Sequence, residues 1–81
     1  MDRTYTMENK FITAKEISRK YELSYQVVNR YSDAGLLDVA FKKGNTRYYE
    51  RRIADSRIRK ISALAREGYS LALIRKQCLG I

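Results

Sequence analysis

Apolar residues recur with helical spacing in four separate stretches of the chain. In the first stretch, Ala14, Ile17 and Tyr21 lie three and four residues apart and would share one face of a short helix. Such a face is what a surface helix needs in order to pack on a common core. Three further helices are predicted over residues 24–34, about 51–66 and 71–79.

Capping residues mark the ends of these helices. Thr13, followed three residues later by Glu16, has the form of a capping box, in which each side chain accepts a hydrogen bond from the other residue's backbone. Ser24 and Ser70 precede the second and fourth helices and are expected to cap them. The later helices are expected to end in a left-handed residue at Gly35, Gly68 and Gly80.

The third helix is the longest, and basic and apolar side chains are interleaved along it. Its arginines and its lysine spread around the helix, so only the first turn is expected to face a partner. The others, Arg57 among them, are expected to lie in solvent. The side chains predicted to face the core are Ile53, Ile58, Ile61, Leu64 and Ala65.

Between the second and third helices the periodicity changes to that of a β-strand. Leu37, Val39 and Phe41 occupy alternate positions, which predicts a half-buried strand. Residues 42–45 would form a turn and residues 46–49 the returning strand. The first two helices are joined by a turn of about three residues, which is typical of a helix-turn-helix. The predicted fold is therefore mainly α with a small β-hairpin, a winged helix-turn-helix in the order helix-helix-hairpin-helix-helix.

Length and composition exclude several classes of protein. The chain has 81 residues, enough for one small core, so a single domain is expected over residues 11–81, after a flexible arm at residues 1–10. One cysteine and no histidine exclude a disulfide framework and a zinc-ligand cluster. No apolar run reaches the roughly 18 residues of a membrane span. We therefore expect no enzyme, cofactor, metal site or membrane association, and a cytoplasmic location.

The positive charge is concentrated in one part of the sequence. The chain has a net charge of +8, with 17 lysines and arginines against 9 acidic residues. Residues 1–41 are balanced, whereas residues 42–66 hold nine basic side chains against two acidic ones. Such a basic segment favours a polyanionic partner. An amphipathic cationic helix on a membrane or an acidic protein is a weaker alternative, because the isoleucines of residues 51–66 are needed for the core.

The second helix carries side chains suited to reading double-stranded DNA. Gln26 and Asn29 could pair with adenine edges, and Arg30 with guanine or phosphate. The alternative reading is an ordinary solvated helix face. The basic hairpin beside this helix, with Lys42 and Lys43, favours DNA, because lysines there would contact phosphates.

The order of these elements and several short motifs resemble the DNA-binding domain of the MerR family of bacterial regulators. The matching motifs are Leu23-Ser24, Tyr31, Gly35-Leu36-Leu37, the hairpin run Gly44 to Tyr49, and Gly68-Tyr69-Ser70-Leu71. The resemblance covers roughly residues 11–79. It implies that Arg47 is the wing arginine, that Tyr49 lies in the core, and that Arg66 and Tyr69 form a second wing.

The chain also departs from the family pattern. An Arg-Tyr-Tyr-Glu run is usual in the second helix, and Asn29-Arg30-Tyr31-Ser32 stands there instead, so a contact made by the family's first arginine does not transfer to Asn29. Full-length members continue into a dimerising helix and an effector-sensing region, so this sequence is expected to be either a fragment of such a protein or a minimal form without these regions. The residues expected to contact DNA are Lys15, Arg19, Ser24, Tyr25, Gln26, Asn29, Arg30, Lys42, Lys43, Asn45, Thr46, Arg47, Tyr48, Arg51, Arg66 and Tyr69.

Two functions are compatible with this sequence. The first is a sequence-specific transcription regulator that binds double-stranded DNA, with RNA polymerase as a further partner. The second is an excisionase-like architectural factor that bends DNA for a recombinase. In both cases we expect a monomer in isolation that binds DNA cooperatively or as a dimer.

Overall fold

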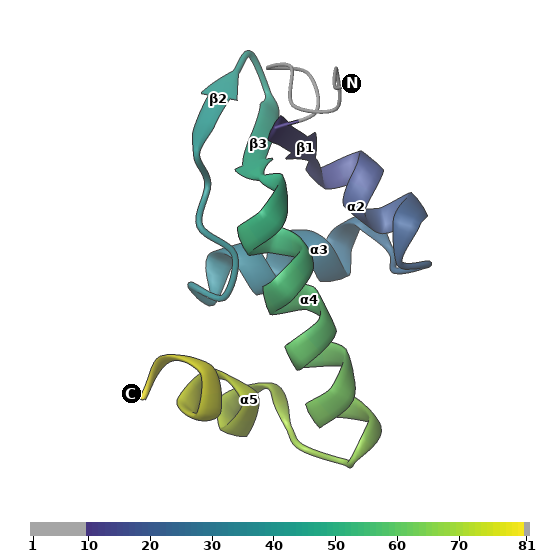
Figure 1. Cartoon of the computed structure of the whole chain (residues 1–81), viewed down its shortest axis with the longest axis vertical. Helices are drawn as coiled ribbons and strands as arrows, with labels where there is room; N and C mark the ends of the chain where they lie inside the picture. Colours follow the sequence, from purple (N-terminus) through teal and green to yellow (C-terminus); the bar gives the residue numbers. More distant parts are fainter. Residues whose placement is uncertain (1–9, 81) are drawn as a thin grey trace, which may run out of the picture.

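The computed structural model describes residues 10–80 and confirms the predicted fold class, with four helices and a small antiparallel sheet over these residues (Figure 1). The expected flexible arm at residues 1–10 lies, apart from Lys10, outside the described residues. The elements are β1 (Phe11–Thr13), α2 (Ala14–Lys20), α3 (Tyr25–Asp33), β2 (Phe41–Lys43), β3 (Thr46–Glu50), α4 (Arg51–Arg66) and α5 (Leu71–Leu79).

The predicted helix starts are confirmed by hydrogen bonds. Thr13 and Glu16 form a complete capping box, with the Glu16 N–H donating to Thr13 Oγ1 at 3.1 Å and the Thr13 N–H donating to Glu16 Oε1 at 2.9 Å. Ser24 Oγ accepts from the backbone N–H of Val27, and Ser70 Oγ caps α5 in the same way. Each cap satisfies a backbone donor that the helix itself leaves unpaired.

The end of α3 is a Schellman motif, as its glycine predicts. Gly35 has φ +83°, and its N–H donates to the Ser32 carbonyl at 3.0 Å. The N–H of Leu36 donates to the Tyr31 carbonyl at 2.9 Å, which completes the motif. Gly68 and Gly80 end α4 and α5, also as predicted.

The sheet has one strand more than the predicted hairpin. Its order is β1-β3-β2, with both neighbouring pairs antiparallel. β1 has only three residues, too few for its alternation to be recognised in the sequence. Ile12 in β1 lies opposite Tyr49 in β3, and both side chains are buried, so the expected core position of Tyr49 is confirmed.

The strand predicted over residues 37–41 is wrong except at its end. Only Phe41 belongs to a strand, and Val39 and Phe41 are 39% and 41% exposed. The hairpin register explains the difference, because Phe41 pairs with Tyr48 and the Ala40 N–H makes one further bond to the Tyr48 carbonyl. β3 ends at Glu50, two residues after Tyr48, and α4 begins there, so Leu37 and Asp38 have no strand residue opposite them.

Two predicted core positions of α4 are also wrong. Ala54, Ile58 and Ile61 form its buried stripe, at i, i+4 and i+7. Ile53 precedes this stripe by one residue, which rotates its side chain by about 100°, and it is 57% exposed. Ala65 is also exposed, and the side chain near the end of α4 that packs against Ile61 and Ile74 is that of Leu64.

The core consists of two clusters of buried side chains, and α3 packs on both. The first cluster joins the sheet to α2, α3 and α4 and includes Ile17, Val28 and Ile58. The second joins α4 to α5 through Ile61 and Ile74, with the thiol of Cys78 half-buried against it. The partly buried ring of Tyr31, on α3, packs against both clusters.

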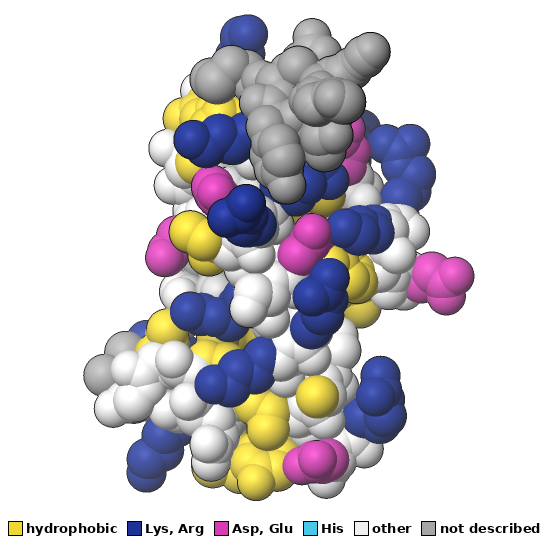
Figure 2. Space-filling view, in the orientation of Figure 1, with side chains coloured by type: hydrophobic (Ala, Val, Ile, Leu, Met, Phe, Trp, Pro, Cys, Tyr) yellow, Lys and Arg dark blue, Asp and Glu magenta, His cyan; other side chains and the backbone are white. Residues whose placement is uncertain are grey.

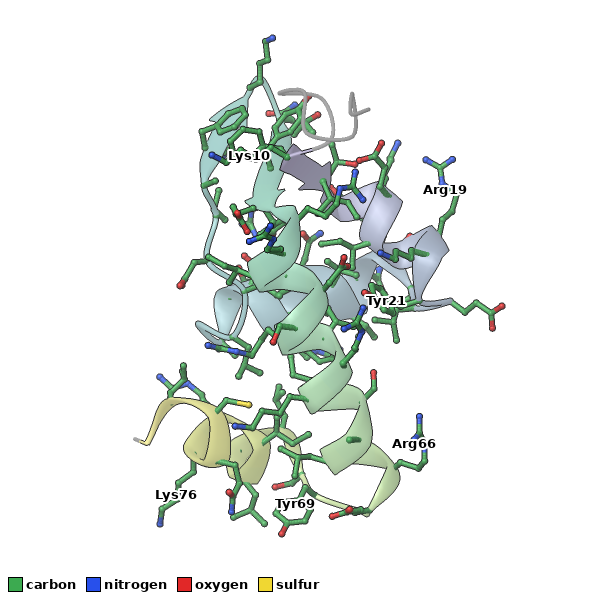
Figure 3. All side chains as sticks on the ribbon, in the orientation of Figure 1. Lys10, Arg19, Tyr21, Arg66, Tyr69 and Lys76 are labelled. Carbon is green, nitrogen blue, oxygen red and sulfur yellow. The ribbon has the colours of Figure 1, made fainter. Side chains whose placement is uncertain are left out.

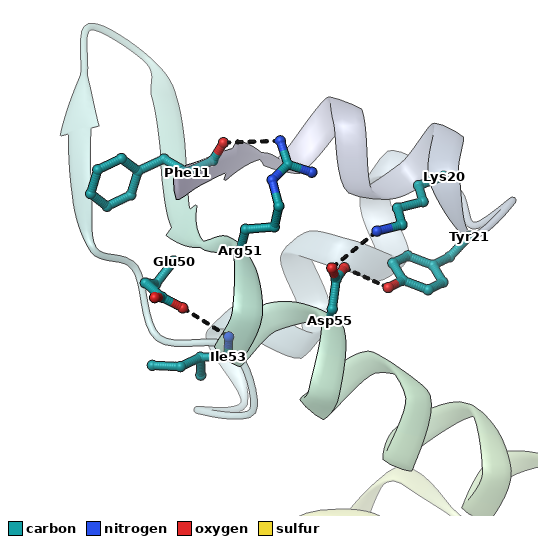
Figure 4. Close-up of polar contacts among 7 residues, drawn as sticks. All are labelled: Phe11, Lys20, Tyr21, Glu50, Arg51, Ile53 and Asp55. Atoms are coloured by element: carbon teal, nitrogen blue, oxygen red, sulfur yellow. Dashed lines mark hydrogen bonds and ion pairs between the residues drawn. The ribbon is translucent and has the colours of Figure 1, made fainter. Parts of the chain in front are cut away.

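A polar cluster fastens the end of α2 to α4 (Figure 4). The Tyr21 hydroxyl donates to Asp55 Oδ1 at 2.5 Å, and the Lys20 ammonium donates to Oδ2 at 3.0 Å. Burial and then the hydrogen bond to Asp55 raise the pKa of Tyr21 to about 12. Burial alone would raise the pKa of Asp55, but the hydrogen bonds from Tyr21 and Lys20 outweigh it and lower that pKa. The cluster therefore holds the helix-turn-helix against α4.

Candidate nucleic-acid interface

The outer face of α3 presents the polar side chains that the sequence predicts there. Val28 is fully buried on the inner face, and Tyr25, Gln26 and Arg30 are exposed. Asn29 is half-buried beside them. The helical period places these four residues around one side of the helix, away from the core.

Arginines from the two later helices hold the far end of α3 in place. Arg57 Nη1 donates to the Leu36 carbonyl at 3.0 Å, and Arg75 Nε donates to the Ala34 carbonyl at 2.7 Å. The Ala34 carbonyl, at the C-terminus of α3, lacks a partner within the helix, and the Arg75 guanidinium both satisfies it and matches the helix dipole. The expectation that Arg57 lies free in solvent is therefore wrong. Nothing in the local sequence signals either contact.

The wing is the hairpin of β2 and β3, and its tip is fully exposed and basic. Lys42 lies opposite Arg47, and Lys43 lies opposite Thr46. Gly44 has φ +62° at the first central position of the two-residue turn, which matches a type II′ turn. Asn45 follows with negative φ, as that turn type requires. All of residues 41–46 are exposed.

An ion pair connects the wing to the end of α3. Arg47 Nη1 lies 3.4 Å from Asp33 Oδ1, with the two side chains 32% and 69% exposed. The Tyr49 hydroxyl, and after it Asp33, raise the pKa of the Arg47 guanidinium. The Tyr49 hydroxyl is buried and has no hydrogen-bond partner of regular geometry within the described part of the chain, so it raises the pKa of Arg47 because its oxygen lies close to the guanidinium. Arg47 is thus charged at every relevant pH and faces α3.

Tyr48 lies on the opposite face of the sheet from Arg47. Its ring stacks on that of Phe41, with centroids 4.7 Å apart, and Phe11 meets Phe41 edge-on at 5.0 Å. Alternation along β3 places Lys42 and Arg47 on the other face. The three rings tie β2 to β1 across β3 and so support the wing.

The remaining predicted contact residues are spread along the molecule. Lys15 and Arg19 are exposed on α2. Arg66 is exposed and Tyr69 half-buried at the turn between α4 and α5, at the end of the long axis away from the wing (Figure 3). Arg51 donates to the Phe11 carbonyl at 3.3 Å, a contact that fixes β1. Figure 2 shows basic side chains along the whole visible face, from the wing to the turn before α5.

Two kinds of site are absent from residues 10–80. No group of three or more His, Cys, Asp or Glu side chains is placed to hold a metal ion. None of the helices there is long and apolar enough to cross a membrane.

A comparison with protein families adds to this geometry. The model described as "MerR HTH family regulatory protein" matches residues 12–80. The chain belongs to the MerR family. Neither the curated proteins nor the solved structures gave a significant match. The MerR family consists of DNA-binding transcription regulators and is not an enzyme family, so double-stranded DNA is the partner that membership implies.

Within this MerR-family domain the structure brings some predicted residues together and separates others. The outer face of α3 and the wing meet at the Asp33–Arg47 pair. Tyr48 and Arg51 instead contribute to the support of the wing and β1. The sequence reading missed Asp33 and also Arg75, whose contacts join residues 14 and 41 positions apart.

Proposed function

We propose that this MerR-family chain is a sequence-specific regulator that places the outer face of α3 in the major groove of DNA. The observation that carries this proposal is the exposed polar face of α3 beside an exposed basic wing. The major groove admits one α-helix and presents a distinct pattern of donors and acceptors for each base pair.

Each side chain on that face has a defined role in the proposal. The carboxamides of Gln26 and Asn29 donate to and accept from adenine, and the Arg30 guanidinium pairs with guanine. Ser24 and Tyr25 stand at the start of α3, where backbone N–H groups and the positive end of the helix dipole favour a phosphate.

The wing supplies contacts to phosphate that do not depend on sequence. Lys42, Lys43 and Arg47 are the cationic side chains, and Asn45 and Thr46 add polar groups at the exposed turn. Lys15 and Arg19 on α2 extend the same role to the flank of the helix-turn-helix. Such contacts set register and raise affinity for any duplex.

The arrangement along the long axis fits a groove flanked by two phosphate contacts. The wing, α3 and the turn with Arg66 and Tyr69 follow one another along that axis in Figure 1, and the molecule is 39 Å long. One turn of B-form DNA is about 34 Å. A second phosphate contact at Arg66 and Tyr69 is therefore within reach of the same duplex.

The experiment that tests this function is selection of bound duplexes from a random pool, followed by measurement of affinity at several salt concentrations. A recovered motif and a loss of about a thousandfold between about 50 and 200 mM salt, as for about six phosphate contacts, support the proposal. Salt-sensitive binding with no motif would instead favour an architectural factor acting with a recombinase. A flat salt response contradicts both.

Single substitutions distinguish the proposed role of α3, which is to recognise bases, from that of the wing, which is to bind phosphates. Gln26→Ala and Asn29→Ala should change the preferred base, whereas Lys42→Ala should weaken binding to all sequences alike. Lys76→Ala is the matched control, because this lysine is exposed on α5 and is not one of the side chains proposed to contact DNA. Identical effects of all four substitutions would refute the division.

A further inference from the structure

Asp33 is the single acidic residue on α3, and the wing adds only Glu50, the last residue of β3, whose side chain accepts from the Ile53 N–H and caps α4. Residues 25–33 and 41–49 contain no other Asp or Glu, although they carry Arg30, Lys42, Lys43 and Arg47. If this surface faces DNA, the carboxylate of Asp33 faces phosphates of the same sign. Its presence there therefore opposes the binding that its neighbours favour.

The position of Asp33 within α3 is unfavourable on its own account. It is the last residue of the helix, where the negative end of the helix dipole disfavours an acidic side chain. Its side chain is 69% exposed, so it contributes little to the core. The contact that Asp33 does make is the ion pair with Arg47, at 3.4 Å.

That ion pair is weak enough to be exchanged. Exposed pairs of this kind contribute about 0.2–1 kcal/mol. A DNA phosphate presents the same charge and the same oxygen acceptors to a guanidinium, and binding it also releases a counterion. Asp33 thus occupies Arg47 in the way a phosphate would, and a duplex must displace it.

We propose that Asp33 is an internal competitor for Arg47 that lowers the affinity of the wing for DNA of arbitrary sequence. Arg47 remains on Asp33 until α3 is seated in a groove, and its exchange to phosphate then adds to contacts already made by α3. Binding to duplexes that α3 does not read gains less from the wing. This inference rests on the proposed function.

The test uses the whole chain and a fluorescently labelled duplex of random sequence, with anisotropy read across about 50 to 200 mM salt. Asp33→Asn should bind about threefold more tightly at low salt. This factor is the middle of the range for exposed ion pairs, about 0.2–1 kcal/mol, converted at about 1.4 kcal/mol per tenfold change in affinity. Its plot of log affinity against log salt should steepen by about 0.9, as for one more phosphate contact. Asp33→Glu should keep the wild-type values.

Two further variants show whether Asp33 acts through Arg47. In an Arg47→Ala background, Asp33→Asn should change neither affinity nor slope. Asp38→Asn, the same chemical change at an exposed residue with no ion pair to the wing, should leave both unchanged in the native background. Far-UV circular dichroism of each variant verifies that α3 is folded.

The outcomes separate this inference from the proposed function. Tighter and steeper binding by Asp33→Asn that depends on Arg47 supports the inference. Unchanged or weaker binding, or an equal gain in the Arg47→Ala background or in Asp38→Asn, overturns it while wild-type binding still supports the proposed function. Failure of the wild-type chain to bind any duplex at low salt overturns the proposed function itself.

Discussion

Replacement of Tyr21 by Phe should destabilise the fold in a manner that depends on pH. The substitution keeps the ring, which packs against the first core cluster, and removes the hydroxyl that donates to Asp55 at 2.5 Å. A hydrogen bond to a charged group contributes about 1.5–3 kcal/mol net. Water replaces part of this bond, because the Asp55 side chain is 16% exposed. We therefore expect a loss of about 1.5 kcal/mol at neutral pH.

The pH dependence follows from the raised pKa of Tyr21. Its pKa is 10.0 in an unfolded chain and about 12 in the fold, so the protonated hydroxyl is favoured by folding. This contribution is complete below pH 10 and is lost as the pH rises toward 12. The full difference corresponds to about 2.7 kcal/mol, which solvent screening of the half-buried ring reduces. The gap between wild type and variant should therefore narrow by more than half at about pH 11.

Asp55 adds a second limit at acidic pH. Its pKa is lowered in the fold, so its contribution is present above the ordinary carboxyl range and is lost as the pH falls through the folded pKa. The assay is urea unfolding followed by circular dichroism at acidic, neutral and alkaline pH. All other titrating groups are shared, so the difference between the two proteins isolates Tyr21. A difference that is constant from neutral to alkaline pH would refute the reasoning.

Two further substitutions test the ends of α3. Ser24→Ala should lower the free energy of unfolding by about 1 kcal/mol through loss of the bond to the Val27 N–H, whereas Ser56→Ala, on the exposed side of α4, should lie within about 0.5 kcal/mol of wild type in thermal unfolding. Gly35→Ala should lower the free energy of unfolding by about 1–2 kcal/mol, because φ is +83° there. The added Cβ would lie 3.6 Å from Leu79, an ordinary contact, so the loss reports backbone strain alone. A variant as stable as wild type in urea would show that this strain is negligible.

Features decided by neighbouring residues could be predicted from the sequence. The capping box at Thr13 and the caps at Ser24 and Ser70 span four residues each, and all three formed as expected. The same holds for Gly35, whose left-handed conformation closes a motif within one turn of helix. Local chemistry settles such features before any tertiary contact is made.

Features decided by tertiary register could not be predicted in this way. The strand expected at residues 37–41 has the right alternation, but its pairing with β3 stops at Ala40, and the residues that would lie opposite Leu37 and Asp38 belong to α4. The predicted buried face of α4 begins at Ile53, whereas the observed one begins one residue later, at Ala54, and both share Ile58 and Ile61. β1 forms because β3 offers it an edge, a reason that its own three residues do not contain.

The candidate interface shows why a count of basic residues overstates how many side chains are free to bind phosphate. Arg51 and Arg57 donate to backbone carbonyls, Arg47 is held by Asp33, and Lys20 is paired with Asp55. These side chains keep their charge and so contribute to the electrostatic field around the protein. To bind a phosphate, however, each must first break its present hydrogen bond or ion pair, which offsets part of the free energy that the phosphate contact contributes. Lys42 and Lys43, at the exposed wing, carry no such cost in the hydrogen bonds and ion pairs of residues 10–80. The salt dependence of DNA binding should therefore follow the number of exposed cations in the proposed interface, on the wing, α3, α2 and the turn before α5, rather than the net charge of +8.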